Sequence, residues 1–155
     1  MTNVQAAAER ERPVDIDEDQ QRRARIEACL RPSAPRRARV AASHEECARL
    51  LAEGEALLAD GALSHNHFWY RGDAIDAALE TGDAAEARRH ADALERYASV
   101  EPTPWSDFTV ARARALADAV DGCADVAAIR ALRVRASALD LRAALPALDA
   151  ALAGK

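Results

Sequence analysis

The residues best suited to metal chemistry in this chain are two histidines, His65 and His67. With a third ligand, Asp107 or His90, they have the residue types of a zinc site. In a helix, positions i and i+2 point about 200° apart, which prevents chelation by this pair. We therefore expect structural roles for both histidines. The alternative is a small helical metal- or ligand-binding enzyme that uses His65, His67 and Asp107.

A second set of residues recurs at helical spacing and has the chemistry of a protein-binding surface. Asp73, Asp76 and Glu80 occur at positions i, i+3 and i+7, one turn beyond Trp69. They form an acidic row on one side of a helix, and Arg112 occupies the next helix but one. A surface of this kind can hold a peptide, although the simpler interpretation is a solvated helix face. The candidate partner-binding residues are Trp69, Asp73, Asp76, Glu80 and Arg112.

The same acidic row has the spacing for acid–base chemistry, but no nucleophile or oxyanion donor accompanies it. We expect no enzymatic activity, no catalytic residue, no bound metal and no cofactor.

Helix start and stop signals define the elements that carry these residues. Ser43 and Glu46 fit a capping box, as do Asp83 and Glu86, and Thr103-Pro104 is a favourable helix start. Gly61, Gly82 and Gly122 are typical helix stops. These signals predict helices over 43–60, 65–81, 84–99, 104–121 and 124–139, and a short last helix over 141–152 in which Pro146 makes a kink or begins a new first turn.

The composition favours helices packed on helices. Half of the residues are hydrophobic, but only 4% are aromatic, and alanine dominates. Alanine has the highest helix propensity, and no strand-length alternation of apolar and polar residues occurs. We therefore predict an all-α fold. The rings are confined to 68–108, so we expect the core to gather there, with Phe68, Leu94 and Phe108 of three consecutive helices in one environment.

Trp69 and Tyr70 cannot both point into this core. Consecutive helical residues diverge by about 100°, so Trp69 and Tyr70 cannot both face the same side as Phe68. We expect the preceding helix to cover one of them, and a partner contact is the alternative.

The N-terminal third differs from the rest of the chain. Residues 1–42 carry nine arginines against seven acidic residues. We expect a polar, partly disordered segment with one helix over 15–30 and a solvated basic linker over 31–39. Residues 43–124 carry seven arginines against sixteen acidic residues. An acidic surface repels phosphate, so nucleic-acid binding is not expected.

The remaining composition indicates a cytoplasmic protein. Three cysteines lie far apart in the sequence and form no CxxC pair, which is typical of reduced thiols. No apolar run approaches the roughly 18 residues of a membrane span, and the N-terminus lacks the layout of a secretory signal. The oligomeric state is left open by the sequence.

A repeat is visible in residues 43–155, which we treat as one domain. Gly82 and Gly122 lie forty residues apart, and each is followed closely by an acidic residue and alanines. Gly-Asp-x-x-Glu-Ala at 82–87, with Ala91 and Leu94 after it, resembles the inter-helix turn and second helix of a tetratricopeptide repeat. Arg71, Ala74 and Ile75 stand where that repeat has Trp, Leu and Gly. The resemblance implies stacked antiparallel helix hairpins in an α-α superhelix.

A wider resemblance covers about 53–117. This part of the chain is similar to the tetratricopeptide-like C-terminal region of bacterial adenylate/guanylate cyclase–ATPase signalling proteins. The similar segments are 64–67, 73–75, 82–83, 102–108 and 111–117. This chain has no phosphate-binding Gly-x-x-x-x-Gly-Lys motif, so no catalytic residue of that family transfers to it. The resemblance implies a regulatory or scaffolding module that binds a protein or peptide. Another interpretation is a split piece of a larger cyclase-type protein.

Overall fold

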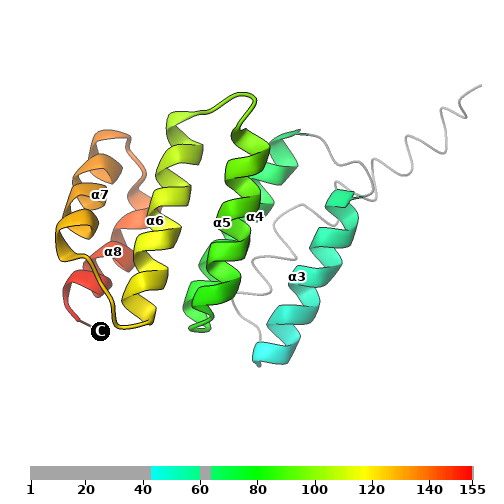
Figure 1. Cartoon of the computed structure of the whole chain (residues 1–155), viewed down its shortest axis with the longest axis horizontal. Coiled ribbons are helices and arrows are strands. Elements are labelled where there is room, and N and C mark those ends of the chain that lie inside the picture. The colour runs from blue at the N-terminus through cyan, green and yellow to red at the C-terminus, as the bar shows by residue number, and fades with distance from the viewer. Residues whose placement is uncertain (1–42, 60–63, 155) are drawn as a thin grey trace, which may run out of the picture.

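Helices account for the regular structure throughout the part of the chain that the structure describes. The computed structural model describes residues 43–59 and 64–154, and these contain no strand. The expected helix over 15–30, the basic linker over 31–39 and the stop at Gly61 lie outside the described residues. The elements in Figure 1 are α3 (His44–Ala59), α4 (Ser64–Glu80), α5 (Ala84–Ala98), α6 (Pro104–Val120), α7 (Val126–Ala138), the 3-10 helix η1 (Arg142–Ala144) and α8 (Leu145–Leu152).

Side chains expected to cap the helices do so. The Ser43 hydroxyl accepts a hydrogen bond from the Glu46 amide at 3.1 Å, and Asp83 accepts one from the Glu86 amide at 2.9 Å. At the start of α6, Thr103 and Ser106 each bond the backbone amide of the other at 3.0 Å. Each bond satisfies an amide that the helix itself leaves without a partner.

The two glycines that are forty residues apart end their helices in the same way. Gly82 and Gly122 have φ of +74° and +76°, a conformation that glycine adopts without steric cost. The residue after Gly82 donates back to the Ala78 carbonyl at 2.8 Å, and the residue after Gly122 donates to the Asp118 carbonyl at the same distance. Both glycines therefore turn the chain sharply into the next helix.

Consecutive helices run antiparallel and pack side by side (Figure 1). In addition, α4 packs against α6, and α6 packs against α8. In Figure 1, α4 lies behind α5 and α8 lies behind α7. Pro146 begins α8 in its first turn, where a proline needs no amide partner, so the new-helix interpretation of Pro146 is confirmed.

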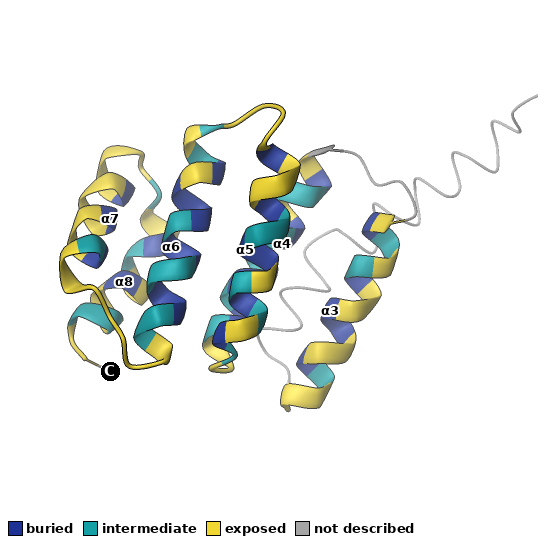
Figure 2. Ribbon diagram, in the orientation of Figure 1, coloured by how far each residue is buried: buried dark blue, intermediate teal, exposed yellow. Residues whose placement is uncertain are grey.

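The core is a row of clusters between successive helices, and Figure 2 shows the buried sides of the helices facing one another. Cys47, Leu50, Leu51 and Leu58 of α3 cluster with Tyr70, Ala74 and Ala77 of α4. The next cluster includes Ile75, Leu94 and Val110, with Phe68 and Trp105 half-buried against it. Leu79 packs against this cluster and against the one beyond it, which joins α6 to α7 and α8.

Phe108 belongs to that last cluster, with Ile129, Leu132 and Leu148. The expectation that Phe68, Leu94 and Phe108 share one environment is therefore wrong for Phe108. Trp105 takes its place beside Phe68, with the ring centroids 5.9 Å apart. The physical reason is that Phe108 is turned about 60° from Trp105 around α6, toward α7 and α8.

Three apolar residues lie beside the buried stripes of their helices and not within them. Val126 is 43% exposed, because it lies at the first turn of α7, about 60° around the helix from Ile129. Ala115 and Ala119 are only half-buried at the edge of the α6–α8 contact. The all-α class itself is confirmed. No helix in the described ranges has both the length and the apolar content needed to cross a membrane.

Candidate functional site

Trp69 is the large apolar side chain that the fold leaves most clearly in water. The residue is 69% accessible. His65, one turn earlier, lies edge-on to the indole with the ring centroids 6.1 Å apart. Tyr70, the next residue, is buried under α3 and donates a hydrogen bond to the Leu51 carbonyl. The preceding helix thus covers Tyr70, as expected for one of the pair, and leaves Trp69 open.

Asp76 and Arg112 form an ion pair between α4 and α6, in which Arg112 is buried and Asp76 is half-buried. Arg112 of α6 is 6% exposed and donates to the Asp76 carboxylate across the contact between α4 and α6. Because the pair is largely desolvated, removal of one partner would leave an uncompensated charge. Arg112 therefore belongs to the contact between α4 and α6. It does not add to the exposed surface around Trp69. Asp73 is half-buried and Glu80 is exposed, each on the same side of α4 as Trp69.

The two histidines of the alternative enzyme function contact different rings. His67 stacks on Tyr97 of α5 at 4.2 Å, whereas His65 lies against Trp69. Asp107 is exposed at the start of α6. Burial, with a contribution from the Arg71 charge, lowers the pKa of His67. In the part of the chain that the structure describes, no three His, Cys, Asp or Glu side chains lie close enough to hold a metal ion.

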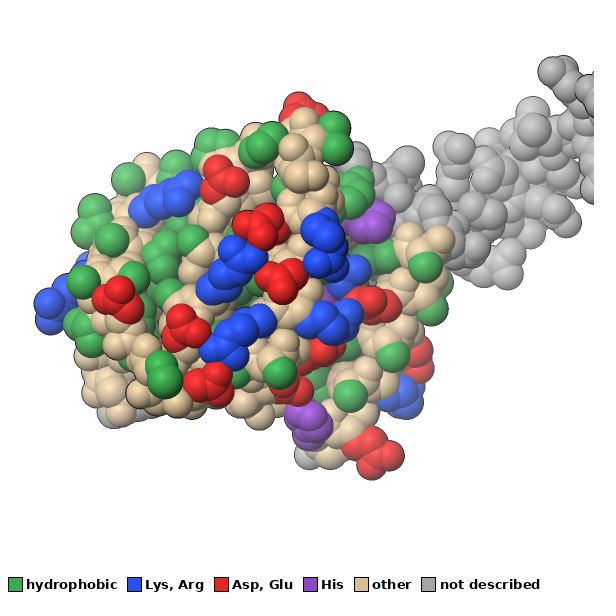
Figure 3. Space-filling view, viewed as in Figure 1, with side chains coloured by type: hydrophobic (Ala, Val, Ile, Leu, Met, Phe, Trp, Pro, Cys, Tyr) green, Lys and Arg blue, Asp and Glu red, His purple; other side chains and the backbone are tan. Residues whose placement is uncertain are grey.

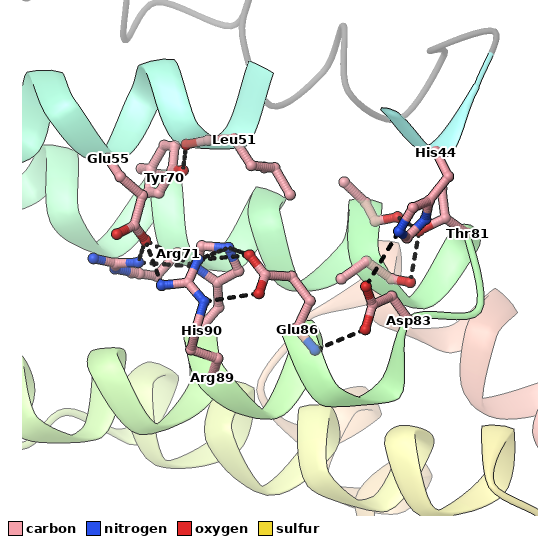
Figure 4. A network of polar contacts seen from close by, with 12 residues as sticks. His44, Leu51, Glu55, Tyr70, Arg71, Thr81, Asp83, Glu86, Arg89 and His90 are labelled. Carbon is pink, nitrogen blue, oxygen red and sulfur yellow. Dashed lines mark hydrogen bonds and ion pairs between the residues drawn. The ribbon is translucent and has the colours of Figure 1, made fainter. Parts of the chain in front are cut away.

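A polar network joins α3, α4 and α5, and the sequence did not reveal it (Figure 4). His90 of α5, with no exposed surface, lies at its centre. Arg71 donates to the Glu55 carboxylate and also to His90 Nδ1, at 2.8 Å. Glu86 Oε1 lies 3.2 Å from His90 Nε2. Arg89 also lies 3.3 Å from His90 Nε2, so each ring nitrogen of His90 has an arginine beside it, and Nε2 has a carboxylate as well.

The electrostatics of this network keep His90 neutral. Burial, followed by the charges of Arg89 and Arg71, lowers the pKa of His90 to about 4, against the opposing pull of Glu86 and Glu55. Burial alone would raise the pKa of Glu55, but the hydrogen bond and charge of Arg71 hold it below its usual value. Two carboxylates and two guanidinium groups therefore balance around an uncharged imidazole.

The network attaches α3 to the α4–α5 hairpin. Arg89 donates to Glu55 at 3.1 Å, so one α3 carboxylate receives arginines from both helices of the hairpin. Burial raises the pKa of the neighbouring Tyr70. Only the contacts of Glu86 with Arg89 and His90, three and four residues away on one helix, follow from sequence spacing. The contacts to Glu55 and Arg71 needed the tertiary structure.

Ion pairs also cover the surface between α5 and α6. Figure 3 shows acidic and basic side chains alternating over the middle of this face. Arg88 reaches Asp118 at 2.6 Å and Asp121 at 2.7 Å, and Arg114 reaches Asp92 and Glu95 at 2.7 Å each. Arg88 and Arg114 therefore lie in ion pairs, and Arg88 joins α5 to the end of α6 while Arg114 joins α6 to α5. This surface has mixed charge and no open basic patch of the kind that binds phosphate backbones.

Comparison of the chain with protein families, with curated proteins and with solved structures finds no match. The resemblance to the cyclase–ATPase C-terminal region therefore depends on the sequence motifs alone.

Proposed function

We propose that this chain is a non-catalytic protein-interaction module made of stacked helix hairpins similar to tetratricopeptide repeats. Two observations support the hairpin stacking. The glycines that end α4 and α6 lie forty residues apart and have the same geometry. The contacts of α4 with α6, and of α6 with α8, are those expected when hairpins stack in a row.

The observation that carries the binding function is the exposure of Trp69. A partner that covers the exposed indole removes a large apolar area from water. Tryptophan is also enriched at the centres of protein interfaces. Asp73 and Glu80 follow on the same side of α4. The matching partner is a protein or peptide that presents an apolar side chain to the indole and basic groups beside it.

The cellular role that we propose follows from the sequence resemblance. It is a regulatory or scaffolding role in bacterial signalling, in the cytoplasm, like that implied for the helical end of cyclase–ATPase proteins. A catalytic role has less support, because His65 and His67 contact different rings and no three candidate metal ligands lie close together in the described residues.

The test is affinity capture from a bacterial lysate with the full chain and two variants. Trp69→Ala removes the proposed contact, and Val120→Ala removes another exposed apolar side chain, 45% accessible at the far end of α6. We expect a protein that is captured by the wild type and by Val120→Ala but about tenfold less by Trp69→Ala, which corresponds to a typical hot-spot loss. Equal capture by all three chains, or capture by none, would contradict the proposal.

A further inference from the structure

A cleft lies between the last turn of α5 and the first half of α6. Its volume is about 300 Å³, and every residue that lines it belongs to the described part of the chain. α5 contributes residues between Glu95 and Ser99, α6 contributes residues between Ser106 and Arg114, and Pro102 of the connecting loop also lines the cleft. A volume of this size is at the lower limit of the pockets that hold small ligands.

The walls of the cleft are largely apolar. Ala98 and Val110 are buried, Ala111 is half-buried, and the ring of Pro102 adds to this surface. The two serines of the lining each donate to a backbone carbonyl, at 2.7 Å and 2.9 Å. The cleft therefore suits an alkyl group, because its hydroxyl groups are already engaged within the chain.

The side chains around the cleft carry more negative than positive charge. Arg114 donates to Asp92 and to Glu95 at 2.7 Å each, so this cation is already shared between two carboxylates. Asp107 is exposed in the first turn of α6. Its carboxylate makes no hydrogen bond or ion pair with any residue that the structure describes. The cleft thus presents an available carboxylate beside an apolar wall.

These features select the chemistry of the occupant. An anion would be repelled by Asp107 and Glu95. A divalent metal ion needs several oxygen ligands, and no three acidic, histidine or cysteine side chains in the described ranges could hold one. A cation at the end of an alkyl chain fits both parts of the cleft, because its chain covers the apolar wall while its head meets the carboxylate.

We propose that this cleft binds an organic cation on a short alkyl chain, namely an alkylguanidinium or alkylammonium group. The chain lies along Val110 and Ala111, and the charged head pairs with Asp107. Free small amines have this chemistry, and so do the arginine and lysine side chains of another protein.

The cleft is separate from the surface around Trp69. Trp105 faces α4, because its ring lies where a Cβ at Gly72 would be only 3.3 Å away. Asp107 follows two positions later and is turned about 200° from Trp105 around α6. Cation binding in the cleft and partner binding at Trp69 can therefore fail independently.

Nuclear magnetic resonance titration of the full chain with butylguanidinium tests the site, with the neutral isostere butylurea as the control ligand. We expect butylguanidinium to shift the backbone amides of 95–99 and 106–114 and to saturate with a dissociation constant of about 1 mM, a reasonable affinity for so small a ligand. Butylurea should bind about tenfold more weakly, because it keeps the alkyl chain but lacks the charge.

Two variants with the same charge change locate the contact. Asp107→Asn should weaken the binding of butylguanidinium about tenfold, because the charge-assisted hydrogen bond is lost. Glu45→Gln removes a carboxylate from the first turn of α3 and should leave the binding unchanged. Both side chains are exposed, so both variants should stay folded.

A second ligand distinguishes the two sources of the cation. Nα-acetylarginine methylamide carries the guanidinium group on a peptide backbone. Tighter binding than that of butylguanidinium identifies a protein side chain as the source, and weaker binding identifies a free small molecule. Both results support the site.

Three results would refute the site. The first is equal binding of butylurea and butylguanidinium, and the second is unchanged binding by Asp107→Asn. The third is a set of amide shifts that spreads over the acidic surface of the chain without saturation, because this pattern indicates general screening of charge.

Discussion

The protonation of His90 depends strongly on its buried surroundings. The folded chain keeps it neutral down to a pKa of about 4, whereas an unfolded chain binds the proton with an ordinary pKa of about 6.5. Between these values the unfolded state holds more protons than the folded state. The free energy of unfolding therefore falls as the pH decreases from 6.5 toward 4. The contribution of the neutral His90 to stability is fully present above pH 6.5.

We predict that the wild type loses about 2 kcal/mol of stability between pH 7 and pH 5 through His90, by linkage over this range. His90→Gln should flatten that dependence, although its stability at pH 7 will also change. His65→Gln removes an exposed histidine and should keep the wild-type slope. Urea unfolding at each pH measures the effect. If His90→Gln retains the slope, another group is responsible.

Side-chain directions were partly predictable at the scale of single residues. The 100° step between helical positions required Trp69 and Tyr70 to separate, and they do. The spacing could not say that Arg112 would be buried against Asp76, because that pair joins residues 36 positions apart on two helices. An arginine has the same appearance in a sequence whether it faces water or an ion-pair partner.

The helix ends after α4, α6 and α7 share one backbone geometry, although the third has aspartate in place of glycine. α4 and α6 end at Gly82 and Gly122, while Asp140 takes this place after α7 with φ of +55°. The residue after Asp140 donates to the Ala136 carbonyl at 2.8 Å, as in the two glycine turns. A residue with a Cβ is strained in this conformation. The third turn is therefore the weakest of the three.

Exchanging residue types at these turns should change stability in opposite directions. We predict that Asp140→Gly raises the free energy of unfolding by about 0.5–1 kcal/mol, since the surface pair with Arg142 contributes little. Gly122→Ala should lower it by about 1 kcal/mol, although open space surrounds the added methyl group. Thermal melts should show a rise and a fall of roughly 3 °C. Shifts of the same sign in both variants would refute the backbone explanation.

Across the whole molecule, α3 depends on a small set of contacts with its neighbours. It packs on α4 through one apolar cluster and through Glu55. Gly54 allows this approach, because a Cβ there would overlap the Tyr70 ring. A helix that depends on one close approach can detach while the rest of the row stays folded.

We predict that Gly54→Ala loosens α3, at a cost of about 1–3 kcal/mol to its docking. Hydrogen exchange should accelerate in α3 and remain unchanged in α6, α7 and α8. Glu53→Ala, on the exposed side of the same helix, is the control and should leave the protection of α3 intact. Equal acceleration along the whole chain would mean that α3 unfolds only together with the other helices.

The sequence by itself determined the elements of this protein. Alanine content, hydroxyl and carboxylate caps, and glycine stops act within a few residues of one another, so the helices from Ser43 onward were predictable to within a few positions. The direction of the buried stripes on these helices follows from the same local periodicity.

Only the tertiary structure decided which elements meet. It placed Trp105, and not Phe108, beside Phe68, and it brought Glu55, Arg71 and His90 into one buried network. It also left Trp69 and Val134 in water at different places on the row. The reason is physical: a cap depends on neighbours along the chain, whereas burial and charge pairing depend on the angle and height at which separate helices pack, and no short run of residues encodes these.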